Sequence, residues 1–192
     1  MHLASGRRSA SPRSAPDNLF VVTGGPGAGK STLLAALSES GCRTWPEAGR
    51  AIIQLAARVG APEPPVDPLS YAAMMHVWDA RSHAEAGRQP GLHLFDRGIP
   101  DTIGYLELVG ATVPGYLAKS AAIHRYARTV LACPPWRAIY ENDTERRQDW
   151  AEAVATFDAV TAAYRRLGYE LVTVPTGTVE ERARFVLSTI AP

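Results

Sequence analysis

Lysine and cysteine are scarce in this sequence, and no apolar run is long. Of the 20 basic residues, only Lys30 and Lys119 are lysines. Cys42 and Cys133 lack the spacing of a metal site or a redox pair, so we expect buried thiols in a reducing, cytoplasmic environment. No apolar stretch approaches the ~20 residues of a membrane-spanning helix, and we therefore predict no membrane partner.

An excess of charge of either sign is also missing. The formal net charge is +1, and three arginines in residues 1–17 account for part of it. The near-neutral remainder argues against nucleic acid as a partner, although a local basic groove remains possible. Residues 1–17 are rich in Ser, Pro and Arg without an apolar stretch. This composition predicts a disordered N-terminal tail, with a weak contact to a partner or to nucleic acid as the alternative.

Strand-like and helix-like segments alternate along the rest of the chain. The predicted strands are 19–23, 42–45, 92–95, 128–133 and 169–174, and the predicted helices are 30–40, 46–60, 69–87, 100–109, 114–125, 144–167 and one that starts at 178. This alternation predicts an α/β fold with a five-stranded parallel sheet flanked by helices, in a single domain over residues 18–192. Because the carboxyl ends of parallel strands share one edge, the residues that follow each strand should converge there.

The segment GGPGAGKST follows the first predicted strand and leads into the first predicted helix. It matches the phosphate-binding pattern G-x-x-x-x-G-K-S in its expected context. Backbone N–H groups and the helix amino end would bind phosphate, Lys30 would reach the β- and γ-phosphates, and Ser31 would ligate Mg²⁺. The predicted ATP site comprises Gly24, Gly25, Pro26, Gly27, Ala28, Gly29, Lys30, Ser31 and Thr32.

The third predicted strand ends in Phe95-Asp96-Arg97-Gly98. Asp96 lies where P-loop proteins place the aspartate that helps to hold Mg²⁺, so we expect it at the metal with Ser31. Hydrolytic motors usually follow that aspartate with a water-activating glutamate, whereas here Arg97 follows. The sequence therefore disfavours a motor, and a surface turn with a salt bridge is the alternative to a metal site.

Several stretches carry a family resemblance: WPEAGRAI, DRGIPDTIGYL, PPWRAIYENDTERRQDW and LGYELVTVP. With the phosphate loop, they resemble the short bacterial predicted ATPases grouped with AAA-type proteins, which are related to the kinase domain that phosphorylates nicotinamide riboside. The chain also resembles, more distantly, the deoxynucleoside kinases, which carry Glu-Arg-Ser where this chain has Asp96-Arg97-Gly98. The resemblance implies a kinase-like P-loop fold with strand order 2-3-1-4-5.

The kinase resemblance also implies catalytic roles. Glu47, after the second predicted strand, would accept the proton of a substrate hydroxyl; a carboxylate that only favours the amino end of a helix is the alternative. Whether Glu47 or Asp96 is the base is left open. Arg97 would orient substrate or phosphate, and Asp101 is a weaker candidate for substrate contact. Arg50 would hold an acceptor anion or Glu47 itself, or lie in solvent.

Arg146 and Arg147 follow Asn142, which we expect to cap the long helix together with Glu145. The resemblance implies a lid near residues 141–150 whose arginines close over the triphosphate and neutralise the γ-phosphate. Alternatively, neighbouring acidic side chains only offset these charges.

We therefore expect an enzyme that binds ATP and Mg²⁺ and transfers the γ-phosphate to a hydroxyl of a small-molecule acceptor, such as a nucleoside-like metabolite. A regulatory ATPase or nucleotide switch that acts on a protein partner is the main alternative. A kinase of nucleic-acid ends is a weaker one, because the chain has no basic run. The acceptor and the oligomeric state are not indicated by the sequence.

Overall fold

A parallel five-stranded sheet forms the centre of the computed structural model, which describes residues 16–62, 67–140 and 149–191. Its strands are β1 (Leu19–Gly24), β2 (Arg43–Trp45), β3 (His93–Asp96), β4 (Thr129–Cys133) and β5 (Glu170–Thr173). The strand order is β2-β3-β1-β4-β5, and every pairing is parallel. The predicted α/β fold and strand order are thereby confirmed.

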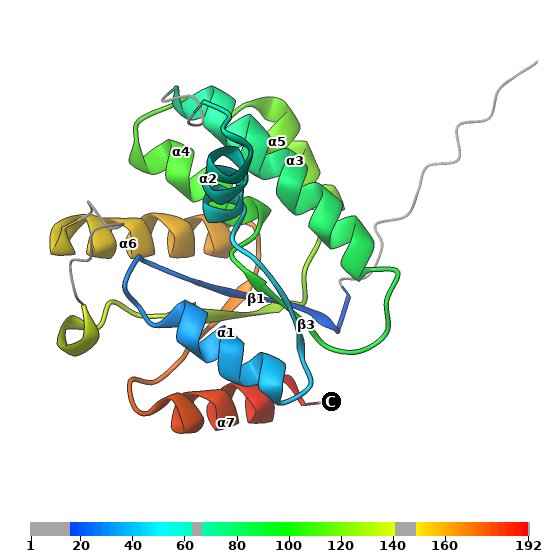
Figure 1. The fold of residues 1–192 in the computed structure, drawn as a ribbon, viewed down its shortest axis with the longest axis vertical. Coiled ribbons are helices and arrows are strands. Elements are labelled where there is room, and N and C mark those ends of the chain that lie inside the picture. Colours follow the sequence, from blue (N-terminus) through cyan, green and yellow to red (C-terminus); the bar gives the residue numbers. More distant parts are fainter. Residues whose placement is uncertain (1–15, 63–66, 141–148, 192) are drawn as a thin grey trace, which may run out of the picture.

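Helices cover both faces of this sheet (Figure 1). They are α1 (Lys30–Glu39), α2 (Ala48–Val59), α3 (Pro68–Ala86), α4 (Ile99–Leu108), α5 (Gly115–Ile123), α6 (Trp150–Arg166) and α7 (Val179–Ile190), with a short 3₁₀ turn at Arg137–Ile139. Helices α1 and α7 lie together on one face, and α6 and α4 lie on the other.

The prediction that the long sixth helix begins near Thr144 is wrong. It begins at Trp150, because Asp149 is the N-cap: its side chain accepts a hydrogen bond from the Glu152 N–H, and the Glu152 carboxylate accepts one from the Asp149 N–H. This reciprocal capping box satisfies two backbone donors at the helix start. Asn142, Glu145 and most of the predicted lid lie outside the described residues, as do residues 1–15 of the predicted tail.

The central strand β1 is buried on both faces, as a strand between two helical layers must be. Phe20 and Val22 pack with Leu33 and Leu37 of α1 and with Val186 of α7. On the opposite face, Leu19 and Val21 pack with Phe95, Val130, Tyr126 and Tyr164. Because successive side chains of β1 point to opposite faces, this one strand packs against the helices of both layers.

The register of the sheet determines which loops lie next to one another at the carboxyl ends of the strands. Val22 pairs with Asp96, and Gly24 pairs with Cys133, so the starts of the loops after β1, β3 and β4 lie side by side. Cys42 and Cys133 are free and buried, as predicted. None of the helices in the described ranges is long and apolar enough to cross a membrane.

Helices α4 and α6 approach closely at Gly104. A Cβ at this position would lie 2.8 Å from the Val160 Cα and 3.0 Å from the Val160 nitrogen. Because those atoms are backbone, Gly104→Ala should force the helices apart and lower the free energy of unfolding by about 1–3 kcal/mol. Chemical denaturation measures this loss.

Gly115→Ala is the matched control, because a Cβ at this first residue of α5 meets no atom within 4 Å. It should leave the unfolding midpoint unchanged or raise it slightly. Equal midpoints for the two variants would contradict the close packing of α4 on α6.

Candidate phosphate-binding site

The segment from the last residue of β1 to the N-cap of α1 contains three glycines with positive φ, Gly24, Gly27 and Gly29. Gly29 is the N-cap of α1 with φ 69°, a left-handed conformation that favours glycine. The Lys30 ammonium is buried and donates hydrogen bonds to the carbonyl oxygens of Gly24 (3.2 Å) and Gly25 (2.9 Å). Burial, and then the positive charge of Arg97, lower the Lys30 pKa, while Asp96 and Glu47 oppose this effect. The amine thus lies inside the loop, next to the expected phosphate position.

Asp96 is the last residue of β3 and is buried, so the surface-turn interpretation of this segment is wrong. Its Oδ1 atom has no hydrogen-bond partner among the described residues. Burial raises the Asp96 pKa, and the charge of Lys30 acts in the opposite direction. A carboxylate oxygen without a partner and the exposed Ser31 hydroxyl, at the second residue of α1, are donors that Mg²⁺ accepts when phosphate and water complete its shell.

Arg97 links two carboxylates at this edge of the sheet. Its Nε lies 3.2 Å from Glu47 Oε1 and its Nη1 lies 3.3 Å from Asp101 Oδ1. Its φ is 69°, a conformation that costs a non-glycine residue about 1 kcal/mol or more. Its backbone N–H donates to the Val22 carbonyl at 3.0 Å, which fixes the turn after β3. The strained turn therefore aims the guanidinium at both acids.

Glu47 is the N-cap residue of α2, yet its side chain makes no capping hydrogen bond. Burial would raise the Glu47 pKa, but the charges of Arg97, Lys30 and Arg50 outweigh burial and lower it. Glu47 is therefore ionised at neutral pH and turned toward the cations of the site. This arrangement favours a role in the site over the helix-end alternative.

Asp101, a weaker candidate from the sequence, has its hydrogen-bonding capacity used within the protein. It accepts hydrogen bonds from the hydroxyls of Thr23 and Tyr164, from the Gly98 N–H and from Arg97. The two hydroxyls come from β1 and α6. Asp101 therefore positions Arg97 rather than offering a free oxygen to a substrate.

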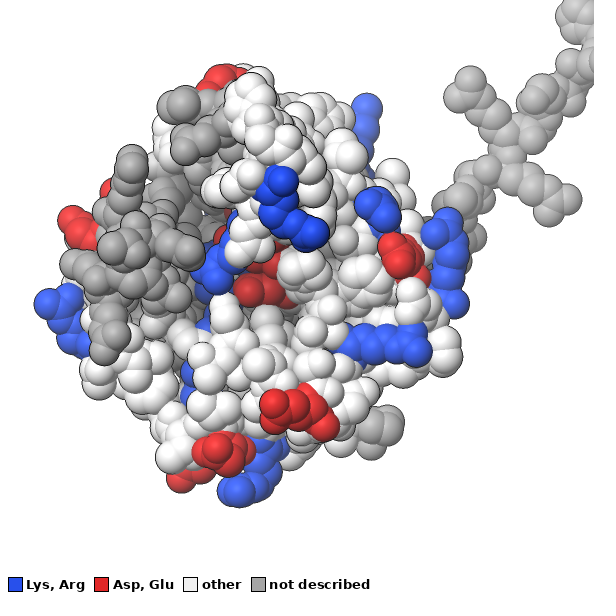
Figure 2. Space-filling view, in the orientation of Figure 1, with Lys and Arg blue, Asp and Glu red and all other residues white. Residues whose placement is uncertain are grey.

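A cavity of about 390 Å³ lies over the loop. Its lining consists of Gly27, Ala28, Gly29, Lys30, Ser31, Thr32, Glu47, Arg50, Trp136, Ile139, Gly177, Thr178, Val179 and Arg182. In Figure 2, basic and acidic side chains meet in a hollow near the centre of the face shown. The structure thus brings Lys30, Ser31 and Glu47 to one cavity. The other predicted site residues within the described ranges, Gly24, Gly25, Pro26, Asp96 and Arg97, are not part of its lining.

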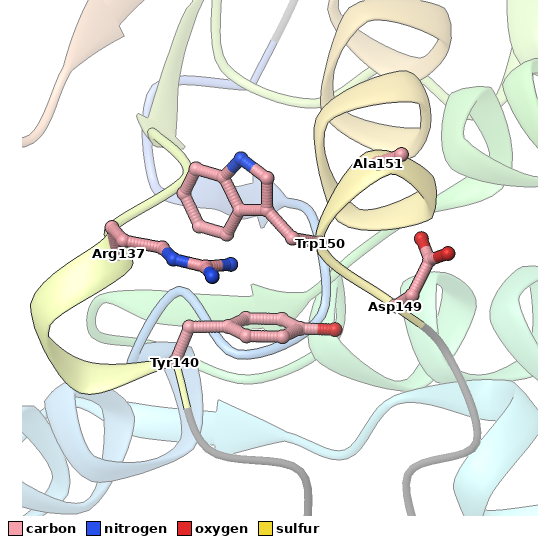
Figure 3. A pocket seen from close by; sticks show the side chains of 5 residues that line it. All are labelled: Arg137, Tyr140, Asp149, Trp150 and Ala151. Carbon is pink, nitrogen blue, oxygen red and sulfur yellow. The ribbon is translucent and has the colours of Figure 1, made fainter.

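A second cavity, of about 540 Å³, lies beside the amino end of α6. Figure 3 shows the Arg137 guanidinium between the rings of Trp150 and Tyr140; it lies 5.1 Å from the Trp150 ring centre. The Tyr140 ring touches the phosphate loop, because a Cβ on Gly27 would lie 2.6 Å from it. The predicted lid arginines, Arg146 and Arg147, lie outside the described residues, so their role stays a prediction.

Sequence reasoning missed two buried charged residues. Asp79 of α3 has no motif around it; burial, and then the charges of Asp101 and Glu47, raise its pKa well above the ordinary value. Arg182 of α7 contacts the phosphate loop from the far end of the chain. The spacing of apolar residues in α3 and α7 could have placed Asp79 and Arg182 on the inward faces of these helices. No local sequence pattern marks either residue as part of a binding site.

Comparisons with known proteins agree with this fold. A family model described as an AAA domain matches residues 19–182, and the search of curated proteins gave no match. The chain is similar to the solved structure of the NadR protein in complex with NR, with 16% identity and a TM-score of 0.66 over 89% of this chain and 49% of that chain. It therefore spans about half of the NadR chain.

Two further solved structures are similar over nearly their whole length. Thymidylate kinase from Ehrlichia chaffeensis is 16% identical, with a TM-score of 0.58 over 91% of this chain and 99% of that chain. Deoxyadenosine kinase from M. mycoides, with products dCMP and dCDP bound, is 12% identical, with a TM-score of 0.61 over 89% of this chain and 97% of that one. At these identities the likeness shows the fold, which is that of P-loop kinases.

The raised pKa of Asp79 predicts a pH-dependent loss of stability. The folded protein binds more protons than the unfolded protein between the ordinary pKa of 3.8 and the folded-state pKa. Stability therefore falls as pH rises through this window. Asp79→Asn stays neutral, so it should raise Tm at pH 8 more than at pH 5, by about 2–4 °C for each kcal/mol relieved.

Thermal unfolding of the variant and the wild type across pH 4–8 measures the effect. Asp158→Asn, at an exposed position of α6, is the control and should shift Tm equally at every pH. A difference between Asp79→Asn and wild type that does not change with pH would contradict the buried, raised-pKa carboxyl.

Proposed function

Because the chain belongs to the AAA domain family, we propose that it binds ATP and transfers the γ-phosphoryl group to a hydroxyl of a small-molecule acceptor. The observation that carries this proposal is the ionised Glu47, held by Arg97 at the same cavity as Lys30 and Ser31. Transfer to a hydroxyl needs a proton acceptor near the phosphate position. The kinase folds of the similar solved structures support the same reaction class.

Each residue of the loop has a defined task in this proposal. The N–H groups at the start of α1 bind the phosphate oxygens. Lys30 leaves the Gly24 and Gly25 carbonyls and donates to the β- and γ-phosphates, where it neutralises charge that develops during transfer. Ser31 and Asp96 would hold Mg²⁺, which neutralises the β- and γ-phosphate oxygens when bound.

The acceptor hydroxyl is activated by Glu47. Its carboxylate accepts the hydroxyl proton as the oxygen attacks the γ-phosphorus, and the bond to the leaving ADP oxygen breaks in line. Arg97 keeps Glu47 ionised and aimed at the cavity. Asp96 is assigned to the metal rather than to the proton, because Lys30 lies close to it and its free oxygen is buried.

A nucleotide-dependent switch that acts on a protein partner is the alternative. Membership of the AAA domain family specifies no phosphate acceptor, which is compatible with such a switch. If this alternative held, a partner would bind only the ATP-loaded protein, and no phosphorylated metabolite would form. A pull-down with ATP and with ADP, beside the product assay below, separates the two functions.

Two substitutions test the proposal. With ATP and a metabolite extract, the wild type should form a phosphorylated product. Glu47→Gln should lower the rate of product formation about 10²–10⁴-fold and leave the Kd for ATP within about threefold, because the amide oxygen still accepts a hydrogen bond from Arg97 but cannot take the proton. Lys30→Met should lower the rate and weaken ATP binding together.

Glu39→Gln, at an exposed position near the end of α1, is the matched control and should keep the wild-type rate. A Glu47→Gln variant with the wild-type rate would refute the assignment of the base. ATP hydrolysis without any phosphorylated product in the wild type would refute phosphoryl transfer itself.

A further inference from the structure

Arg182 is a buried cation without an acidic partner. It lies on α7, is 3% exposed, and forms no ion pair with any residue of the described ranges. An unpaired buried charge is costly unless other groups solvate it. Here the solvating groups belong to the phosphate loop, more than 150 positions earlier in the sequence.

The two terminal nitrogens of Arg182 hold two successive peptide groups of the loop. Nη2 donates to the Ala28 carbonyl at 3.0 Å, and Nη1 donates to the Gly29 carbonyl at 3.2 Å. The fit is close, because a Cβ on Gly29 would lie 2.6 Å from Nη1. Any side chain at position 29 would displace the guanidinium.

Holding a carbonyl also fixes the N–H of the same peptide group. In a planar trans peptide, the C=O and N–H bonds point in opposite directions. The Ala28 carbonyl shares its peptide with the Gly29 N–H, and the Gly29 carbonyl shares its peptide with the Lys30 N–H. Among the described residues, neither N–H donates to a backbone carbonyl. The Gly29 carbonyl also accepts the Leu33 N–H of α1 at 3.2 Å, so α1 and Arg182 together orient the Lys30 N–H, whereas the Gly29 N–H is oriented through the hydrogen bond of Arg182 to Ala28. Both N–H groups point away from the guanidinium.

The guanidinium is held in place by its surroundings. It lies 5.6 Å from the ring centre of Trp136, a cation–π contact that also limits access of water. Arg182, Trp136, Ala28 and Gly29 all line the cavity over the loop. A buried positive charge beside this cavity is stabilised when a polyanion enters it.

We propose that Arg182 is a positioning residue of the phosphate loop, which holds the Ala28 and Gly29 carbonyls so that the Gly29 and Lys30 N–H groups face a bound polyphosphate. The proposal rests on the polyphosphate-binding part of the proposed function and not on phosphoryl transfer. It adds a residue of α7, outside the loop motif, to the determinants of ATP affinity.

Isothermal titration of tripolyphosphate tests this role without a base, an acceptor or turnover. Arg182→Met should weaken the Kd about tenfold or more, the equivalent of one lost charge-assisted hydrogen bond. Arg182→Lys keeps the charge but loses the planar fork that holds two carbonyls. Its Kd should therefore lie between those of wild type and Arg182→Met, about threefold above wild type. ATP should follow the same order.

Two controls separate positioning from simple destabilisation. Arg184→Met removes an exposed arginine from the same helix and should keep the wild-type Kd. Val186→Ala loosens the packing of α7, so it should lower Tm by several degrees and also keep the wild-type Kd while the protein is folded. If Arg182→Met does not fold, Arg182→Lys alone decides the outcome.

The results distinguish this proposal from the proposed function. If wild type binds tripolyphosphate and both Arg182 variants bind it with the wild-type Kd, the positioning role is overturned. A wild-type Kd in Arg182→Lys, with weaker binding in Arg182→Met, would also overturn it, because charge alone would then suffice. If wild type binds neither tripolyphosphate nor ATP, the nucleotide-binding function fails and the positioning role fails with it.

Discussion

The ion pairs of Arg97 with Glu47 and Asp101 connect the elements that meet at the carboxyl-end edge of the sheet. Arg97 and Glu47 are partly buried and Asp101 is buried, so the removal of one partner leaves another charge without compensation and destabilises this edge. Here one guanidinium joins the start of α2, through Glu47, to the start of α4, through Asp101. Thr23 of β1 and Tyr164 of α6 fix Asp101 in turn. The position of Glu47 is thus set by α4 and α6, which lie on one face of the sheet, and by the central strand.

This network also sets the charge state of the edge. The cations around Glu47 lower its pKa, whereas burial raises the pKa values of Asp96 and Asp79. Neighbouring carboxyl groups with opposite shifts suit different tasks. In the proposed reaction the ionised Glu47 takes a proton, and Asp96 is matched to Mg²⁺, whose charge would favour the ionised form of that carboxyl. Loop carbonyls solvate both Lys30 and Arg182. In the proposed reaction Lys30 moves to the phosphate oxygens, whereas Arg182 keeps its two carbonyls.

The strands, their order and the phosphate loop were predictable, because their signals are local or follow from a known motif. The start of α6 was not, because two capping patterns follow each other: Asn142 with Glu145, and Asp149 with Glu152. The second one begins the helix. The hydrogen bonds of Thr23 and Tyr164 to Asp101 could not be predicted from the sequence either. They join residues 78 and 63 positions apart, and no local pattern encodes which helix face meets which strand end. The same holds for Arg182 and Asp79.

The central claim is that the γ-phosphoryl group goes to an acceptor and not to water. Turnover of ATP with a metabolite extract in ¹⁸O-labelled water, followed by mass spectrometry of all phosphate-containing products, tests it most directly. The transferred phosphoryl group should appear on an organic product without ¹⁸O from the solvent, and Glu47→Gln should lower the rate at which this product forms about 10²–10⁴-fold. Inorganic phosphate carrying solvent ¹⁸O as the main product, at the same rate with and without extract, would contradict the central claim.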